Sequence, residues 1–199
     1  MGFLEHYGRV TGRSDLLRTR ARWVSRRSPA YYWGALAHRL MGRDIARERL
    51  VASLSGEARA ELEAAARTYA DDVLPAFANS EIHAALAEHR AKGDRIMILS
   101  SSLDLVVAPI ADSLRVEFAA SSLGFEDGRC TGRIEQDLTG QKAHVADEQR
   151  RIEGGQLVVY TDNRSDRALI DLADRATVVL PRRARSRWWA GDGVQYVRL

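Results

Sequence analysis

The second half of this chain alternates between short apolar runs and helical patterns, and this alternation constrains the fold more than any other feature. The apolar runs cover residues 96–99, 157–160 and 177–180. Runs this short are typical of strands that are buried on both faces of a sheet. Apolar residues recur at helical spacing over 105–114, over 142–152 and through Leu169 and Leu172. Alternating strands and helices predict an α/β fold with a mostly parallel, doubly wound sheet.

The first third of the chain is predicted to be helical. Apolar residues recur at spacings of three, four or seven from about residue 14 to residue 74. A helix with good formers is expected to begin at Ser55 and to end before Pro75. We therefore expect a helical cap region over residues 1–74 and an α/β core over residues 75–199.

Two further elements are predicted from local signals. Residues 121–134 alternate around the turn sequence EDGR, which predicts a β-hairpin. The apolar run 96–99 stops at three serines, so residues 100–102 are expected to form a turn that is rich in hydroxyl groups.

Size and composition limit the class of protein. The chain has 199 residues, of which 45% are hydrophobic, enough for one full-sized core and a small subdomain. Its single cysteine, Cys130, excludes an internal disulfide framework and is typical of a reducing compartment. No apolar run reaches the roughly 18 residues that span a bilayer, and the first residues lack the layout of a secretory signal. We therefore expect a cytoplasmic protein.

Clustered arginines leave a different class of function open. Residues 9–27 contain seven arginines, with Asp15 as the only acid among them, and residues 182–189 form a second basic and aromatic cluster. A helix of this type binds anionic lipid or nucleic-acid phosphates. It is also compatible with a solvated, arginine-rich surface. We expect the solvated surface, and hence no nucleic acid and no membrane as partner.

Polar residues follow two of the predicted strands and begin one predicted helix. Asp162 and Asp166 come directly after one apolar run, Ser100 follows another, and Lys142 stands at a helix start. Ligands bind beyond the carboxyl ends of the strands in open α/β sheets, so these residues form a candidate site.

These residue types suit phosphoryl transfer. A hydroxyl group and backbone N–H groups hold phosphate oxygens, an ammonium group neutralises their charge, and two carboxylates hold Mg2+. Each residue also has a structural interpretation: Asp162, Asp166 and Ser100 as helix caps, and Lys142 as a solvated lysine. Their occurrence together, in this order, favours the chemical interpretation.

Four parts of the chain resemble the motifs of the haloacid dehalogenase superfamily, and within it the phosphoserine-phosphatase-like branch. Residues 98–104 (ILSSSLD) resemble the second motif, a strand that ends in Ser or Thr. Residues 126–133 (EDGRCTGR) are similar to the family's hairpin. Lys142 falls where the third-motif lysine is expected, and residues 161–166 (TDNRSD) resemble the metal-binding fourth motif. The resemblance covers about residues 74–180 and implies a parallel sheet with a small all-helical cap.

The resemblance implies Mg2+-dependent hydrolysis of a small phosphomonoester. It also implies a role for six residues: Ser100 and Lys142 would be catalytic, Asp162 and Asp166 would bind the metal, and Ser101 and Arg49 would bind the substrate. Ser100 would hydrogen-bond the phosphoryl group, and Lys142 would stabilise its charge. Arg49 stands about where the related phosphatases carry a cap arginine, although a surface arginine is the other interpretation. Thr161 departs from the usual glycine of the fourth motif.

The family's first motif, D-x-D-x-T/V, has no counterpart here, because no aspartate is followed by another at the second position. That motif supplies the aspartate nucleophile and the general acid. In the family's sheet, the strand of this motif lies between the strands that correspond to those ending at Ser100 and at Asp162. Without it, the two neighbouring strands would leave backbone N–H and C=O groups unpaired, and each such buried group costs roughly 1–3 kcal/mol. We therefore expect Met1 to be an internal methionine of a longer natural product, and little or no turnover from these 199 residues.

Two alternatives stay open at this point. In the first, the strands close up or residues 194–199 fill the gap, and the chain is a non-catalytic relative that binds phosphate or Mg2+. In the second, the gene has decayed or the chain belongs to another family.

Overall fold

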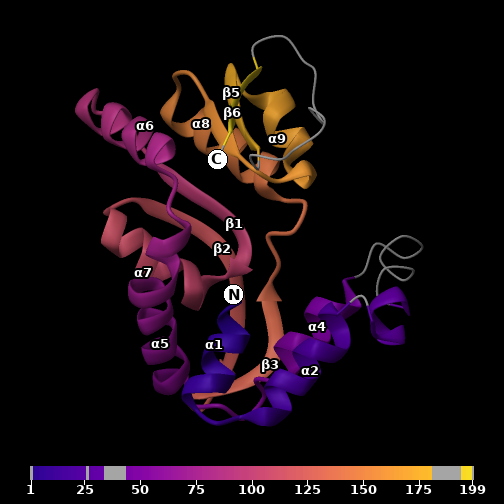
Figure 1. The fold of residues 1–199 in the computed structure, drawn as a ribbon. Coiled ribbons are helices and arrows are strands. Elements are labelled where there is room, and N and C mark those ends of the chain that lie inside the picture. Colours follow the sequence, from indigo (N-terminus) through magenta and orange to yellow (C-terminus); the bar gives the residue numbers. More distant parts are fainter. Residues whose placement is uncertain (1, 26, 34–43, 181–193, 199) are drawn as a thin grey trace. The chain divides into compact units, whose positions relative to one another are not determined.

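A computed structural model describes residues 2–25, 27–33, 44–180 and 194–198 (Figure 1). Its contacts divide the chain into two compact units, and each is described by itself. The first unit comprises residues 1–77 and 100–137, and the second comprises residues 78–99 and 138–199. The predicted α/β fold with a parallel sheet is confirmed. Among the described residues, no helix is long and apolar enough to cross a membrane.

The first unit begins with helices, as predicted. They are α1 (Phe3–Val10), α2 (Ser14–Val24), α4 (Ile45–Ala52) and α5 (Arg59–Thr68), and α5 continues as a π-helical turn (Tyr69–Val73) and a 3-10 turn (Leu74–Phe77). The predicted helix start at Ser55 is wrong, because α5 begins at Arg59. The Gly56 N–H donates to the Cys130 carbonyl at 2.8 Å, and the Cys130 N–H donates to the Glu57 carbonyl at 2.8 Å. Residues 53–56 therefore form a turn, and Ala58 is extended and forms an antiparallel bridge with Arg129 of the hairpin.

The helices and the hairpin share one apolar core. Leu62, Ala66 and Tyr69 lie on one buried face of α5 and its continuation, because residues three and four apart share a helix face. Leu123 and Cys130 enter the same core from the hairpin. The helical segment 1–77 therefore buries its apolar face against residues from 100–137.

The hairpin predicted over 121–134 is confirmed. Strands β2 (Glu117–Glu126) and β3 (Arg129–Gln136) pair antiparallel across a two-residue turn. Both turn residues have a positive φ, 48° at Asp127 and 75° at Gly128. Two consecutive positive φ angles are the signature of the type I′ turn, which an Asp-Gly sequence favours.

Strand β1 (Met97–Leu103) precedes helix α7 (Asp104–Leu114), and the sheet order is β1-β2-β3. The helix is confirmed, whereas the predicted turn at residues 100–102 is wrong, because the strand continues through them. The Ser121 hydroxyl of β2 donates to the Ser101 carbonyl at 3.3 Å. Serine has only a weak local preference for a turn, so partners from the next strand decide the conformation.

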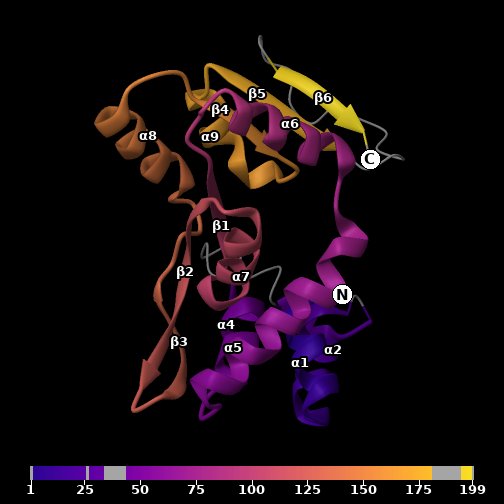
Figure 2. The ribbon, with the colours of Figure 1, turned by 90° about the vertical axis from the view of Figure 1, so that its left-hand side faces the viewer.

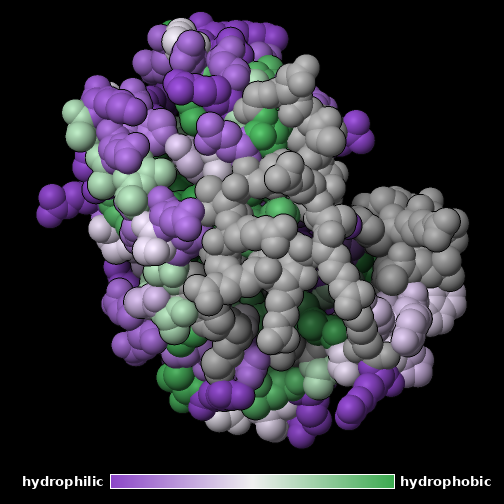
Figure 3. Space-filling model, turned by 45° about the horizontal axis from the view of Figure 1, so that its top comes forward, coloured by the Kyte–Doolittle hydropathy of each residue, from purple (hydrophilic) through white to green (hydrophobic). Residues whose placement is uncertain are grey.

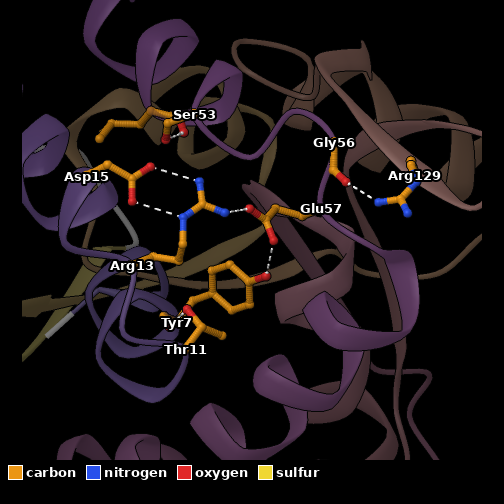
Figure 4. A network of polar contacts seen from close by, with 9 residues as sticks. Tyr7, Thr11, Arg13, Asp15, Ser53, Gly56, Glu57 and Arg129 are labelled. Carbon is orange, nitrogen blue, oxygen red and sulfur yellow. Dashed lines mark hydrogen bonds and ion pairs between the residues drawn. The ribbon is translucent and has the colours of Figure 1, made fainter.

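A network of polar contacts joins α1 and α2 to the segment before α5 (Figure 4). The Tyr7 hydroxyl, which is fully buried, donates to Glu57 Oε2 at 2.6 Å. Arg13 donates to the other oxygen of Glu57 and, through two nitrogens, to Asp15 at 2.8 and 2.9 Å. Burial and the Glu57 carboxylate raise the pKa of Tyr7. The hydrogen bond from Arg13 lowers the pKa of Asp15 to about 2.

Replacing Tyr7 by phenylalanine should destabilise the chain by about 1–3 kcal/mol, because Glu57 then loses a buried donor. Urea unfolding measures the change. Tyr32→Phe is the matched control. Tyr32 is exposed, so the loss of its hydroxyl group should change the free energy of unfolding by less than about 0.5 kcal/mol. Equal effects of the two substitutions would show that the Tyr7–Glu57 bond contributes nothing.

The second unit contains a three-stranded parallel sheet and its helices (Figure 2). Its elements are α6 (Ser80–Ala91), α8 (Lys142–Glu153), β4 (Val158–Thr161), a 3-10 turn (Arg164–Asp166), α9 (Arg167–Leu172), β5 (Arg175–Leu180) and β6 (Val194–Arg198). The predicted helix over 142–152 and the strands at 157–160 and 177–180 are confirmed within one or two residues.

The order of this sheet is β4-β5-β6. Strand β6 pairs with the edge of β5 that lies opposite to β4. The suggestion that residues 194–199 fill a gap beside β4 is therefore wrong for residues 194–198, which are the described part of that segment. Within the described part of the chain, β4 pairs with β5 alone. One edge of β4 is therefore without a strand partner there.

Alternate residues of β4 face opposite sides of the sheet. Val159 is buried in a core with Ala146 of α8 and Ile170 of α9. Tyr160 points to the other side, where its hydroxyl lies 2.9 Å from His89 Nε2 of α6. Helices α8 and α9 thus cover one face of the sheet, and α6 approaches the other.

Candidate functional site

The carboxyl end of β4 carries the polar turn that the sequence singled out. The Thr161 hydroxyl oxygen accepts from the Asn163 N–H at 3.0 Å, and the Asn163 side chain accepts from the Ser165 N–H at 3.1 Å. These two local bonds turn the chain out of the strand and into the 3-10 turn. As a result, Asp166 comes back beside Thr161.

A partly buried ion pair lies at this end of the strand. Lys142 Nζ donates to Asp166 Oδ2 at 2.9 Å, and the Thr161 hydroxyl donates to the same oxygen at 2.8 Å. The side chains of Lys142 and Asp166 are only 13% and 7% exposed. An ammonium group has three donors, so this contact leaves Lys142 with capacity for an anion. Lys142 is therefore a fixed positive charge at the end of β4.

Asp162 differs from Asp166 in its surroundings, because it is exposed. Within the described residues, no group of three or more His, Cys, Asp or Glu side chains stands ready to hold a metal ion. Mg2+, however, is commonly bound through one or two carboxylates, with water and substrate phosphate as its other ligands. An exposed carboxylate at Asp162 and the buried carboxylate of Asp166 fit that requirement.

The expected residues Ser100 and Ser101 belong to the first unit. Ser100 Oγ accepts from the Ser102 N–H at 3.1 Å. The carbonyl of Ser101 accepts from Arg47 Nη2 of α4 at 2.6 Å. Arg47 Nη1 also binds both carboxylate oxygens of Asp137, at 2.7 and 2.8 Å. An arginine and a carboxylate therefore lie beside the serine segment.

The structure brings together some of the expected residues. Lys142 and Asp166 are in direct contact, whereas Arg49 is exposed on α4. Two residues of these groups were not expected there: Thr161, which binds Asp166, and Arg47, which holds Ser101. Thr161 had a signal in the sequence, since it stands in place of the usual glycine. Arg47 had none, because nothing distinguishes it from its neighbouring arginines.

Comparison with known proteins gives a family. The model of the family described as haloacid dehalogenase-like hydrolase matches residues 2–171. No curated protein sequence is significantly similar to the chain.

Solved structures share the fold at low sequence identity. A protein of unknown function from Bordetella pertussis Tohama I matches with a TM-score of 0.61 and 21% identity, over 82% of this chain and 81% of its own. A phospho-aspartyl intermediate analogue of phosphoserine phosphatase matches with a TM-score of 0.59 and 16% identity, over 89% and 79%. A probable phosphoserine phosphatase from Vibrio cholerae matches with a TM-score of 0.63 and 13% identity, over 89% of this chain and 51% of its own.

Proposed function

Because the chain belongs to the haloacid dehalogenase-like hydrolase family, we propose that its site serves the hydrolysis of a small phosphomonoester, as in a phosphoserine phosphatase. The contact of Lys142 with Asp166 at the carboxyl end of β4 carries this proposal. It fixes an ammonium group at the end of the sheet where ligands of α/β folds bind. A phosphoserine phosphatase and a probable phosphoserine phosphatase that share the fold add support.

Each proposed residue has a chemical role. Lys142 would balance the charge of the phosphoryl group, and Ser100 would donate a hydrogen bond to it. Asp162 and Asp166 would hold Mg2+, which as a Lewis acid polarises phosphoryl oxygens when it is bound. Thr161 and Lys142 fix the position of the Asp166 carboxylate. The remaining proposed contacts to the substrate come from Ser101 and Arg49.

We propose little or no turnover for these 199 residues themselves, because they contain no D-x-D pair to supply the nucleophile and the general acid. The proposal includes a cytoplasmic location, a helical cap over residues 1–74 and a core over residues 75–199. Binding of phosphate and Mg2+ without turnover is the second candidate function, and it is favoured by the edge of β4 that has no strand partner among the described residues.

Mg2+ together with inorganic phosphate should raise the melting temperature of the chain. Saturation to about 100 times the dissociation constant stabilises a protein by about 2.7 kcal/mol, which is a shift of several degrees. Asp162→Ala should abolish the shift caused by Mg2+. Asp171→Ala is the control, since Asp171 is an exposed carboxylate on α9.

Thermal melts and a phosphatase assay on small phosphoesters separate the outcomes. A Mg2+-dependent shift that Asp162→Ala removes and Asp171→Ala retains supports the site. The absence of any shift in the unsubstituted chain, or its persistence in Asp162→Ala, contradicts it. Mg2+-dependent turnover that Asp162→Ala removes would contradict only the proposed lack of a nucleophile.

A further inference from the structure

A segment of the first unit exposes large apolar side chains. It comprises the end of α2 and residues 27–33, where Trp33 is 69% exposed, Tyr32 is 63% exposed and Val24 is 46% exposed. On the face shown in Figure 3, hydrophilic side chains cover much of the described surface and hydrophobic side chains form small groups. Neighbouring exposed aromatic side chains on a polar surface mark a site of interaction.

The same segment is strongly basic. Residues 16–33 contain five arginines and no acidic residue. Arg18, Arg22 and Arg27 are exposed to solvent. Leu16, only 1% exposed, anchors α2 in the core of the first unit, so the helix is held while these cations face outward. Within this segment no carboxylate offsets the charge.

Cationic and aromatic groups meet around one hollow. Arg27, Pro29, Tyr32 and Trp33 line a space of about 470 Å³. The rings of Tyr31 and Tyr32 pack edge to face, with centroids 5.4 Å apart. An arginine beside tryptophan and tyrosine is suited to the headgroup region of a membrane, where the ring is amphipathic and the guanidinium meets phosphate.

We infer that the surface formed by residues 18–25 and 27–33 docks on an anionic phospholipid bilayer. Charge complementarity supplies the attraction, because arginines near an anionic leaflet each strengthen binding. Val24 and Pro29 favour lipid over nucleic acid, because these aliphatic side chains insert among acyl chains and have no aromatic face for stacking on bases. This inference departs from the expectation of no membrane partner, and it rests on the exposure of Tyr32 and Trp33.

Co-sedimentation with vesicles tests this surface on the full chain. Vesicles of phosphatidylcholine and phosphatidylglycerol in equal parts should bind the chain at low salt, and vesicles of phosphatidylcholine alone should not. Binding should fall with added salt, because the attraction is screened. Arg22→Gln with Arg27→Gln should weaken it by about fivefold for each arginine. Tyr32→Ala with Trp33→Ala should weaken it at low and at high salt.

Arg67→Gln with Arg133→Gln is the charge-matched control, since both arginines are exposed on other elements of the same unit. Circular dichroism melting shows whether each variant is folded. If the alanine variant is unfolded, Tyr32→Phe with Trp33→Phe replaces it, because this variant keeps an aromatic ring at both positions. Three results would overturn the inference: no binding to the anionic vesicles, equal loss in the control variant, or binding to double-stranded DNA alone. These readouts are independent of Mg2+, phosphate and turnover, so they are separate from the tests of the proposed function.

Discussion

A β-strand that ends in Asp-x-Asp-x-Thr, added ahead of Met1, should raise the Mg2+-dependent turnover of a small phosphomonoester by at least about a thousandfold. Within the described residues, β4 pairs only with β5, so its other edge offers backbone groups to an added strand. Parallel pairing there would place the new carboxylates at the same end of the sheet as Asp162. The chain would then gain the nucleophile that its 199 residues lack.

Release of inorganic phosphate measures turnover, and urea unfolding measures the effect of strand pairing. Asn in place of the first added Asp is the matched control, which should keep the gain in stability and lose the turnover. A chain that becomes more stable with the added strand and still shows no turnover would contradict the proposed phosphatase chemistry. A chain that gains neither stability nor turnover would show that the added strand does not pair with the edge of β4.

Lys142→Met should destabilise the second unit by about 3–5 kcal/mol, because it leaves the carboxylate of Asp166 buried without its ammonium partner. The Thr161 hydroxyl would remain as a donor to that carboxylate, but it carries no charge. Urea unfolding measures the loss. The same substitution should also remove the stabilisation by inorganic phosphate, if Lys142 balances the phosphoryl charge as proposed.

Lys92→Met is the matched control, because Lys92 and Lys142 are the only lysines of the chain and Lys92 is exposed. Its effect should stay within about 0.5 kcal/mol. Lys142→Met with Asp166→Asn removes both charges, and it should cost less than the sum of the single substitutions. If Lys142→Met were as mild as Lys92→Met, the ion pair would have no structural role.

The elements that the sequence predicted correctly are those with a strong local cause. The Asp127-Gly128 turn requires two positive φ angles, which these residue types accept, so the hairpin followed from the sequence. The strands at 157–160 and 177–180 followed from apolar runs that are too short for helices. The helix expected from Ser55 failed, because backbone bonds between Glu57 and Cys130 are formed by residues distant in sequence.

In the candidate site, too, the sequence predicted the features that have a local cause and missed the long-range contacts. The spacing of Asp162 and Asp166 after an apolar run marked the end of β4, and Lys142 marked the start of α8. The sequence could not show that Lys142 and Thr161 bind the same oxygen of Asp166, because that contact needs α8 and β4 folded side by side. Nor could it show which α4 arginine, Arg47 or Arg49, reaches Ser101.

By itself, the sequence determined the order and type of most elements, the family and the absence of a D-x-D pair, because each depends on residue type and local spacing. The tertiary structure alone decided that β6 lies beside β5, that the half-buried Lys142 pairs with the buried Asp166, and that Tyr32 and Trp33 are exposed. These outcomes depend on which surfaces pack together across long stretches of chain, and no local pattern of residues carries that information.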